Sequence, residues 1–340
     1  MRTPPPANSR RTPPEFDYFA DVVMRFVDAT ESLLQEEMSH QFNIGSAALR
    51  DCAARFEHEG TLSKQTLLTL ATQQVDVGHD QCDLLRGIAA AARADRVTLA
   101  PFPLARTSAV IAAKAWYVLT ADSRQERLRR YLNEQLAALY DSPLPYAEDE
   151  EENDDDVVAE AVKFRDDRTT DYLAVGATAD LTPVYRKKPR PWEPPFFARP
   201  DQAATTPSEP AQPVEELYRA VAPPSEKQLM RDLYQAAGLQ TDQLAGFPYS
   251  LLSAATHGRF RQAGLVTYVP TGSSSVGGVR TTARSITLGV MAQSTVYAAL
   301  ATRTYLCALA RYTAVSEEVV LNRLRQPAAE WLAITPPAAD

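Results

Sequence analysis

The stretch that decides the fold spans residues 103–134 and reads PLARTSAVIAAKAWYVLTADSRQERLRRYLNE. Its first half carries only two charged residues, Arg106 and Lys114, so we expect a helix that other helices surround. Its second half includes Ser123 and, three residues later, Glu126. This is the spacing of a capping box, in which a hydroxyl and a carboxylate satisfy two backbone N–H groups at a helix start. The stretch therefore predicts two consecutive helices, the first of them in the interior of the protein.

Helical periodicity continues on both sides of this stretch. Apolar residues recur three and four positions apart, and the helices expected from them are 15–38, 46–56, 63–93, 104–120, 123–140, 225–237, 248–264, 285–313 and a short one from 316 that ends before Pro327. Segment 285–310 approaches a membrane span in length, but it contains Gln293 and Arg303, which favour a buried core helix. The fold class is expected to be all-α, a helical bundle of about seven to nine helices.

The middle of the chain has a different composition. Residues 148–156 read EDEEENDDD, and adjacent like charges resist packing. Residues 181–224 are rich in proline, although the segment 184–197, VYRKKPRPWEPPFF, has the aromatic content to dock on the helical body. The expected organisation has two helical regions, at 15–146 and 224–326, which together form the bundle. Between them lies a disordered or extended acidic and Pro-rich insertion or linker at 147–223, and the second region contains a mobile loop or small hairpin at 265–284. A disordered tail at 1–14 and a tail at 327–340 flank the bundle.

Composition limits the class of protein and of partner. Of 340 residues, 45% are hydrophobic, enough for a sizeable core, and the net charge is −8 without a dense basic cluster. Nucleic acid and anionic membranes both attract basic surfaces, so neither is an expected partner. Cys52, Cys82 and Cys307 lie far apart, which predicts buried small side chains rather than a metal or redox motif. The polar N-terminus has no secretory signal, and arginine and alanine are abundant, so we expect a cytoplasmic bacterial protein.

Two groups of polar residues are candidates for a site. The first group lies in the quoted stretch and comprises Arg106, Trp116, Arg127, Arg130 and Tyr131. A helical hairpin would bring its arginines together, either as an anion-binding pocket or, as we favour, in structural pairs with acids such as Glu134. The second group, Tyr249, Ser253 and His257, has i, i+4, i+8 spacing along one helix face. A Ser/His relay would also need an oxyanion hole and an orienting acid, so buried hydrogen bonding is the expected role.

A third group of residues has the spacing of metal ligands. It comprises Asp76, His79, Asp80 and Asp83, three or four positions apart on one helix face. This face lies opposite the apolar stripe, and the chain has no Glu-x-x-His pair, the usual metal signature of helical bundles. A solvated polar face is the favoured interpretation, so neither a metal nor a cofactor is expected. The glycine-rich tip at 272–278 lacks the sequence of a phosphate-binding loop.

Two sequence blocks resemble a large group of uncharacterised, mostly actinobacterial all-helical proteins. In their first block an arginine opens an apolar helix, a tryptophan lies near its end, and an E-R-x-x-R pattern follows; the matching residues here are Arg106, Trp116, Glu126, Arg127 and Arg130. Their second block is Tyr-x-x-Leu-Ser-x-x-x-His, matched by Tyr249, Leu252, Ser253 and His257. The chain departs from the group at Ala109 and Val110, where related domains often have an acid. The resemblance covers about an eighth of the chain and implies a helical body in which the two blocks meet. It implies no activity.

A more distant likeness is to helical abortive-infection and HEPN-type ribonuclease domains. Their signature is an arginine followed four to six residues later by a histidine, and no histidine of this chain has that spacing. We therefore expect an intracellular helical interaction or regulatory protein without a catalytic motif, with a protein partner or a homodimer. The alternative is a helical-bundle hydrolase or RNase-like defence protein that acts through Arg106, Arg127 and His257.

Overall fold

The structure is a computed structural model. It describes residues 14–38, 42–53, 66–94, 99–141, 155–187, 190, 193–203, 214–259, 264–265, 267–273 and 280–334. These residues form twelve helices and two small two-stranded antiparallel sheets, so the fold is all-α, as expected. The helix number exceeds the expected seven to nine because three further helices lie in the segment 147–223, which was expected to be a disordered or extended insertion.

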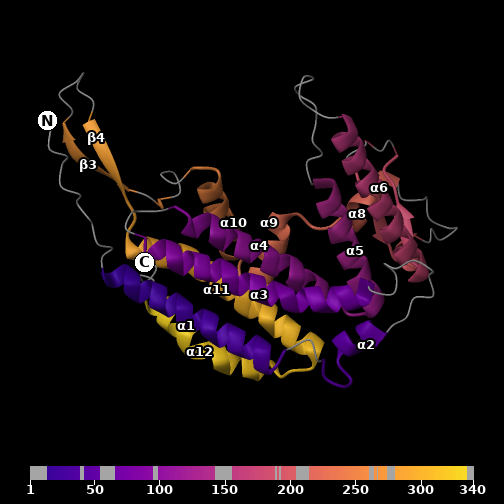
Figure 1. The fold of residues 1–340 in the computed structure, drawn as a ribbon, viewed down its shortest axis with the longest axis horizontal. Coiled ribbons are helices and arrows are strands. Elements are labelled where there is room, and N and C mark those ends of the chain that lie inside the picture. Colours follow the sequence, from indigo (N-terminus) through magenta and orange to yellow (C-terminus); the bar gives the residue numbers. More distant parts are fainter. Residues whose placement is uncertain are drawn as a thin grey trace.

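The central helix of the bundle is α4, formed by the stretch with only two charges. The helices of this body are α1 (Pro14–Glu36), α2 (Ala47–Ala53), α3 (Thr66–Ala92), α4 (Pro101–Leu119), α9 (Glu226–Ala236), α10 (Asp242–Thr256), α11 (Leu288–Thr313) and α12 (Glu317–Ile334). Helix α4 packs against α3, α9, α10 and α11, and α1 and α12 lie together along the opposite edge (Figure 1). Being covered on several sides requires an apolar surface almost all round, and α4 has one. Its predicted place in the interior is confirmed.

Helix α11 is the long apolar segment whose length approached a membrane span. It packs on α4 and α12, and its buried hydroxyls, such as those of Thr295 and Thr313, donate to carbonyls of their own helix. Thr287 caps its N-terminus by accepting a hydrogen bond from the Val290 N–H. The predicted core helix is confirmed. In the part of the chain that the structure describes, no helix combines the length and apolarity that a bilayer crossing requires.

Two prolines lie inside helices. The expected end of the last helix before Pro327 was wrong, because α12 continues to Ile334. Proline removes one helical hydrogen bond, but four residues later Trp331 is fully buried between Phe19 and Phe26 of α1, with ring centroids 5.8 Å apart in each pair. This packing stabilises the last turns. The expected helix start at 248 was also wrong, because α10 begins at Asp242 and Pro248 lies inside it. Thr241 caps its N-terminus by accepting a hydrogen bond from the Leu244 N–H.

The insertion forms a second group of elements beside the body. It follows α5 (Arg124–Asp141) and contains α6 (Asp155–Thr178), β1 (Thr182–Val184), β2 (Phe196–Ala198), α7 (Pro200–Ala203) and α8 (Val214–Val221). These elements stand apart from the body in Figure 1, with α5 leading into them. The described part of the insertion is thus not wholly extended, since α6 has 24 residues. Most of the acidic run, at 148–154, lies outside the described residues.

The strand β2 docks the insertion onto α5. All three of its residues are buried, in agreement with the docking expected of segment 184–197. Asn133 of α5 receives a hydrogen bond from the Phe197 N–H at 2.7 Å and donates to the carbonyls of Phe197 and Val221 at 3.2 and 2.9 Å. A Cβ at Gly176 of α6 would collide with the Phe197 ring, so only glycine permits this close approach.

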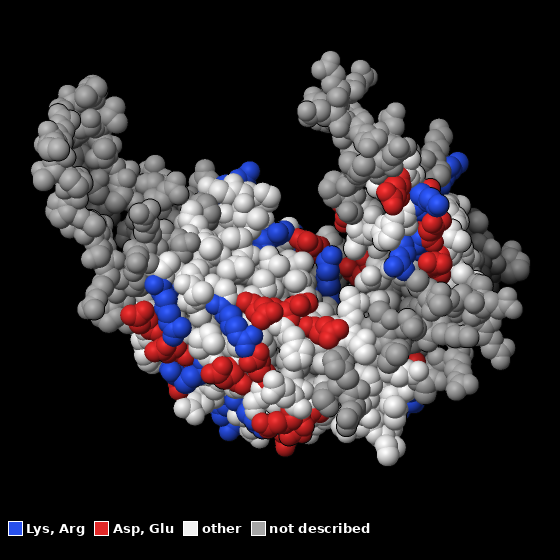
Figure 2. All heavy atoms as spheres, in the orientation of Figure 1, with Lys and Arg blue, Asp and Glu red and all other residues white. Residues whose placement is uncertain are grey.

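The segment expected as a loop or hairpin forms the strands β3 (Thr267–Ser273) and β4 (Arg280–Ser285) of an antiparallel hairpin. Most of its glycine-rich tip, at 274–278, lies outside the described residues. Elsewhere, acidic and basic side chains alternate over the face made by α1 and α3 (Figure 2), where Arg86 pairs with Glu31 and Arg93 with Asp21. The described residues of this face therefore form no basic patch of the kind that binds nucleic acid.

Candidate functional site

The first predicted arginine, Arg106 on α4, pairs with an acid of another helix. Its Nη2 donates to Oε2 of Glu226, the first residue of α9, at 2.6 Å. Its guanidinium carbon lies 5.9 Å from the centroid of the Tyr249 ring on α10, within cation–π range. The two sequence blocks therefore meet in space, at Arg106 and Tyr249. The contact ties α4, α9 and α10 together, which favours structural pairing over an anion pocket.

Arg127 pairs with a carboxylate that the sequence analysis missed. Its Nε and Nη2 donate to the two oxygens of Asp51 at 2.9 and 3.2 Å, and the Tyr312 hydroxyl donates to the same carboxylate at 2.9 Å. Asp51 is 0% exposed. Burial, with the nearby Asp51 charge, raises the pKa of Tyr312 far above its ordinary value, so this hydroxyl keeps its proton. The set links α2, α5 and α11 and leaves no charged group free to react.

A second buried carboxylate, that of Glu126, pairs with two arginines in the first turns of α5. It accepts hydrogen bonds at 2.8 Å from both Arg129 and Arg130. Burial alone would raise the pKa of Glu126, but these two arginines outweigh it and lower the pKa to about 2. The Glu126 N–H donates to Ser123 Oγ at 3.1 Å, so that half of the capping box is confirmed. The carboxylate, expected to complete the box, is engaged with the arginines instead.

The remaining predicted residues do not join these pairs in one site. Trp116 is half-buried against the core, and Ser253 is half-buried on α10. His257 is exposed at the end of α10, and its backbone N–H, not its ring, donates to the Ser253 carbonyl. Arg106 and Arg127 are each engaged with a separate carboxylate. The structure therefore does not assemble Arg106, Arg127 and His257 into one hydrogen-bonded group.

The candidate metal ligands lie on the outer face of α3. Asp76, His79, Asp80 and Asp83 are all exposed, and Asp83 accepts a hydrogen bond from Arg86 at 3.0 Å. Across the described ranges of the chain, no group of three His, Cys, Asp or Glu side chains is close enough to hold a metal ion. This geometry is that of a solvated, partly ion-paired helix face.

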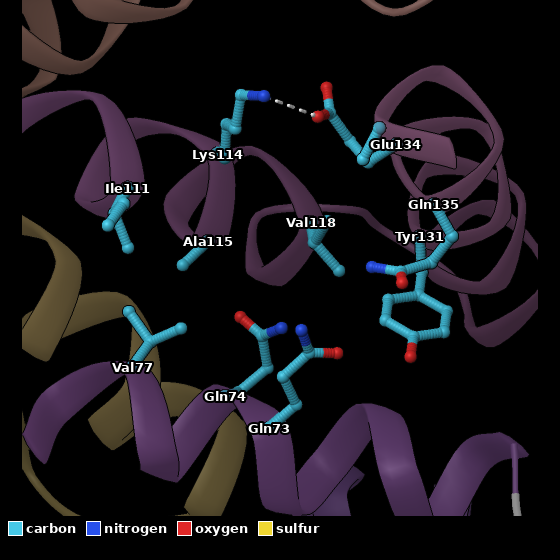
Figure 3. Close-up of a pocket in the computed structure, with 11 residues that line it drawn as sticks. Gln73, Gln74, Val77, Ile111, Lys114, Ala115, Val118, Tyr131, Glu134 and Gln135 are labelled. Carbon is cyan, nitrogen blue, oxygen red and sulfur yellow. Dashed lines mark ion pairs between the residues drawn. The ribbon is translucent and has the colours of Figure 1, made fainter. Parts of the chain in front are cut away.

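A cavity of about 170 Å³ lies between α3, α4 and the second half of α5 (Figure 3). Its apolar lining is Val77, Ile111, Ala115, Val118 and Ala138. Its polar lining is Gln73, Gln74, Lys114, Tyr131, Glu134 and Gln135. Sequence analysis singled out Tyr131 and, as a possible arginine partner, Glu134; it missed the three glutamines. Gln73 and Gln74 are adjacent in the first half of α3, and this pair was the signal available.

Several polar groups of the cavity are not fully paired. Burial raises the pKa of Glu134, and Lys114, whose Nζ lies 3.4 Å from the carboxylate, offsets this only in part. Gln74 Oε1 is buried without a hydrogen-bond partner. In the part of the chain described, the side chains of Gln73, Gln135 and Tyr131 also form no hydrogen bond. A buried polar group without a partner is costly, so this cavity is the best candidate for a ligand site.

Comparison with known proteins adds no constraint. Searches against protein-family models, curated proteins and solved structures gave no match.

Proposed function

We propose that this chain is a non-catalytic, cytoplasmic interaction or regulatory protein that forms a homodimer through α10. The observation that carries the proposal is an exposed apolar face. Leu244 and Phe247, three residues apart on α10, are 56% and 47% exposed. Contiguous apolar surface on a folded protein commonly marks an interaction site.

The apolar face extends beyond these two side chains. Leu251, seven residues after Leu244, is half-buried on the same side of the helix. The Phe247 ring packs edge-on against Tyr297 of α11, with centroids 6.3 Å apart. One side of this ring is thus held in place by the bundle while the other faces solvent. Such a fixed aromatic anchor loses little conformational entropy on binding.

The apolar face of α10 is suited to a second copy as the partner. A twofold interface presents the same patch from both subunits. Leu244 and Phe247 of one copy would then pack against the same pair on the other. Asp242 lies about 200° around the helix from Leu244 and accepts a hydrogen bond from Gln235 of α9, so it stays outside such an interface.

The ion pairs support a structural rather than a catalytic role for the conspicuous arginines. Arg106, Arg127 and Arg130 each neutralise an acid, Glu226, Asp51 and Glu126 respectively. Truncating any of them is then expected to affect folding first.

The dimer is tested by measuring molar mass in solution with sedimentation equilibrium. We expect the wild type to be dimeric and Phe247→Glu monomeric, because a buried charge at the centre of the interface is unpaired. The matched control is Phe164→Glu, since Phe164 is also exposed but lies on α6. A monomeric wild type, or loss of the dimer in both variants, contradicts the proposal.

Two further variants test the face of α10 that is used. Leu244→Glu, on the same face as Phe247, should also disrupt the dimer, whereas Asp242→Arg, on the opposite face, should not. A dimer that Asp242→Arg disrupts but Leu244→Glu leaves intact would contradict an interface on the apolar face.

Incubation with RNA tests the enzymatic alternative. Cleavage by the wild type that both Arg106→Ala and His257→Ala abolish would overturn the non-catalytic assignment.

A further inference from the structure

The cavity between α3, α4 and α5 has the size of a small organic molecule. Its volume is about 170 Å³, and an apolar cavity of roughly 150 Å³ accommodates benzene. The Lys114 side chain is 39% exposed, so this end of the cavity reaches solvent. A ligand of about six to nine heavy atoms therefore has both space and an entry.

The cavity presents one charge of each sign at the same end. Figure 3 shows the Lys114 ammonium and the Glu134 carboxylate facing each other, 3.4 Å apart. A ligand with only one charge would break this pair and leave one of the two groups without a partner. A zwitterion exchanges partners instead: its ammonium binds Glu134 while its carboxylate binds Lys114. No net charge then enters the half-buried site, which keeps the desolvation cost low.

The neighbouring carboxamides line the part of the cavity away from the Lys114–Glu134 pair (Figure 3). Gln74 Oε1 is a buried acceptor without a partner there, and the amide N–H groups of Gln73 and Gln135 are donors that line the same space. The Tyr131 hydroxyl, also in the lining, keeps its proton because burial raises its pKa.

The rest of the lining is aliphatic. Val77, Ile111, Ala115 and Val118 come from α3 and α4 and offer a surface for a small apolar side chain. No further charged side chain lines the cavity within the described residues.

We propose that this cavity binds a free α-amino acid with a compact aliphatic side chain. Lys114 holds its carboxylate, Glu134 holds its ammonium, and the walls of α3 and α4 hold its side chain. This site is separate from the α10 face, so it does not depend on the proposed dimer.

Titration calorimetry with L-leucine as the probe tests the proposal. Two analogues remove one charge each: 3-methylbutylamine lacks the carboxylate, and 4-methylpentanoate lacks the ammonium. We expect each to bind about tenfold more weakly or worse, because each loses charge-assisted hydrogen bonds. Absence of leucine binding, or equal affinity for either analogue, would overturn the assignment.

Variants locate the bound molecule. Ala115→Phe fills the cavity and should abolish leucine binding, and Lys114→Met, at a partly exposed position, should weaken it by about tenfold without disturbing the fold. The matched control is Lys163→Met, because Lys163 is exposed on α6. Binding should persist in Phe247→Glu, which separates this proposal from the dimer. Leucine binding that is unchanged in both Ala115→Phe and Lys114→Met would contradict the proposed site.

Discussion

Helix α5 carries two buried glutamates two turns apart, and their surroundings differ sharply. Glu126, near the start of the helix, has two arginines within hydrogen-bond distance, and they lower its pKa to about 2 despite its burial. Glu134, in the second half, has only Lys114, at 3.4 Å, and burial raises its pKa. Similar burial therefore has opposite consequences, depending on how many donors reach the carboxylate.

The same contrast holds for the neighbours of the two glutamates. Around the start of α5, Arg127 is fully engaged with Asp51, and Arg129 also donates to the carbonyls of Phe197 and Val221. Around Glu134, the amides of the cavity have unused hydrogen bonds. The first half of α5 thus joins α2, α11 and the insertion. The second half instead borders polar side chains without hydrogen-bond partners, which a ligand could use. Three substitutions test this contrast.

The largest effect is expected for Arg127→Met. This change leaves Asp51, which is fully buried, without its cationic partner, and breaking one side of a buried pair costs roughly 3–5 kcal/mol. Urea unfolding followed by circular dichroism measures the loss. The matched control is Arg124→Met, because Arg124 is exposed in the first turn of the same helix, and surface changes usually stay within about 0.5 kcal/mol. Equal stability of the two variants would refute the structural role of Arg127.

The next effect is expected for Glu126→Gln, and it depends on pH. A folded-state pKa of about 2 against the ordinary 4.5 corresponds to about 3 kcal/mol. Because the folded pKa is depressed, this stabilisation is fully present above about pH 4.5 and is lost as the pH falls through about 2. The wild type should therefore exceed Glu126→Gln in unfolding free energy near neutral pH, and the gap should close in acid. A gap that does not change with pH would show that packing, not charge, accounts for the loss.

Sequence reasoning could find the paired half of α5 but not its partners. The E-R-x-x-R pattern and the interior position of the preceding helix indicated that Arg127 and Arg130 needed acids. Glu126, the partner of Arg130, lies in that pattern, but Asp51, the partner of Arg127, and Glu226, the partner of Arg106, are distant in sequence. A lone acid within the short apolar helix AALRDCA was the available hint for Asp51.

The fold was more predictable than the site because helical periodicity is a local property. The interior positions of α4 and α11 followed from their apolar composition. The continuation of α12 past Pro327 did not, since it depends on the packing of Trp331 against two distant phenylalanines. The cavity was invisible for the same reason: its glutamines form a site only when three helices place them around one space.

The smallest effect, and the one of opposite character, is expected for Glu134→Gln. Burial raises the pKa of Glu134, so its ionised form destabilises the folded protein at pH values above that folded pKa, and this penalty is relieved as the pH falls through it. Replacing the carboxylate removes the penalty and loses only a half-exposed ion pair with Lys114, worth at most about 1 kcal/mol. Near neutral pH we therefore expect Glu134→Gln to be as stable as the wild type or slightly more so, by urea unfolding, with the exposed Glu160→Gln as the control. If Glu134→Gln instead loses as much stability as Glu126→Gln, then both glutamates stabilise the fold to the same extent. Glu134 would then not be available to bind a ligand.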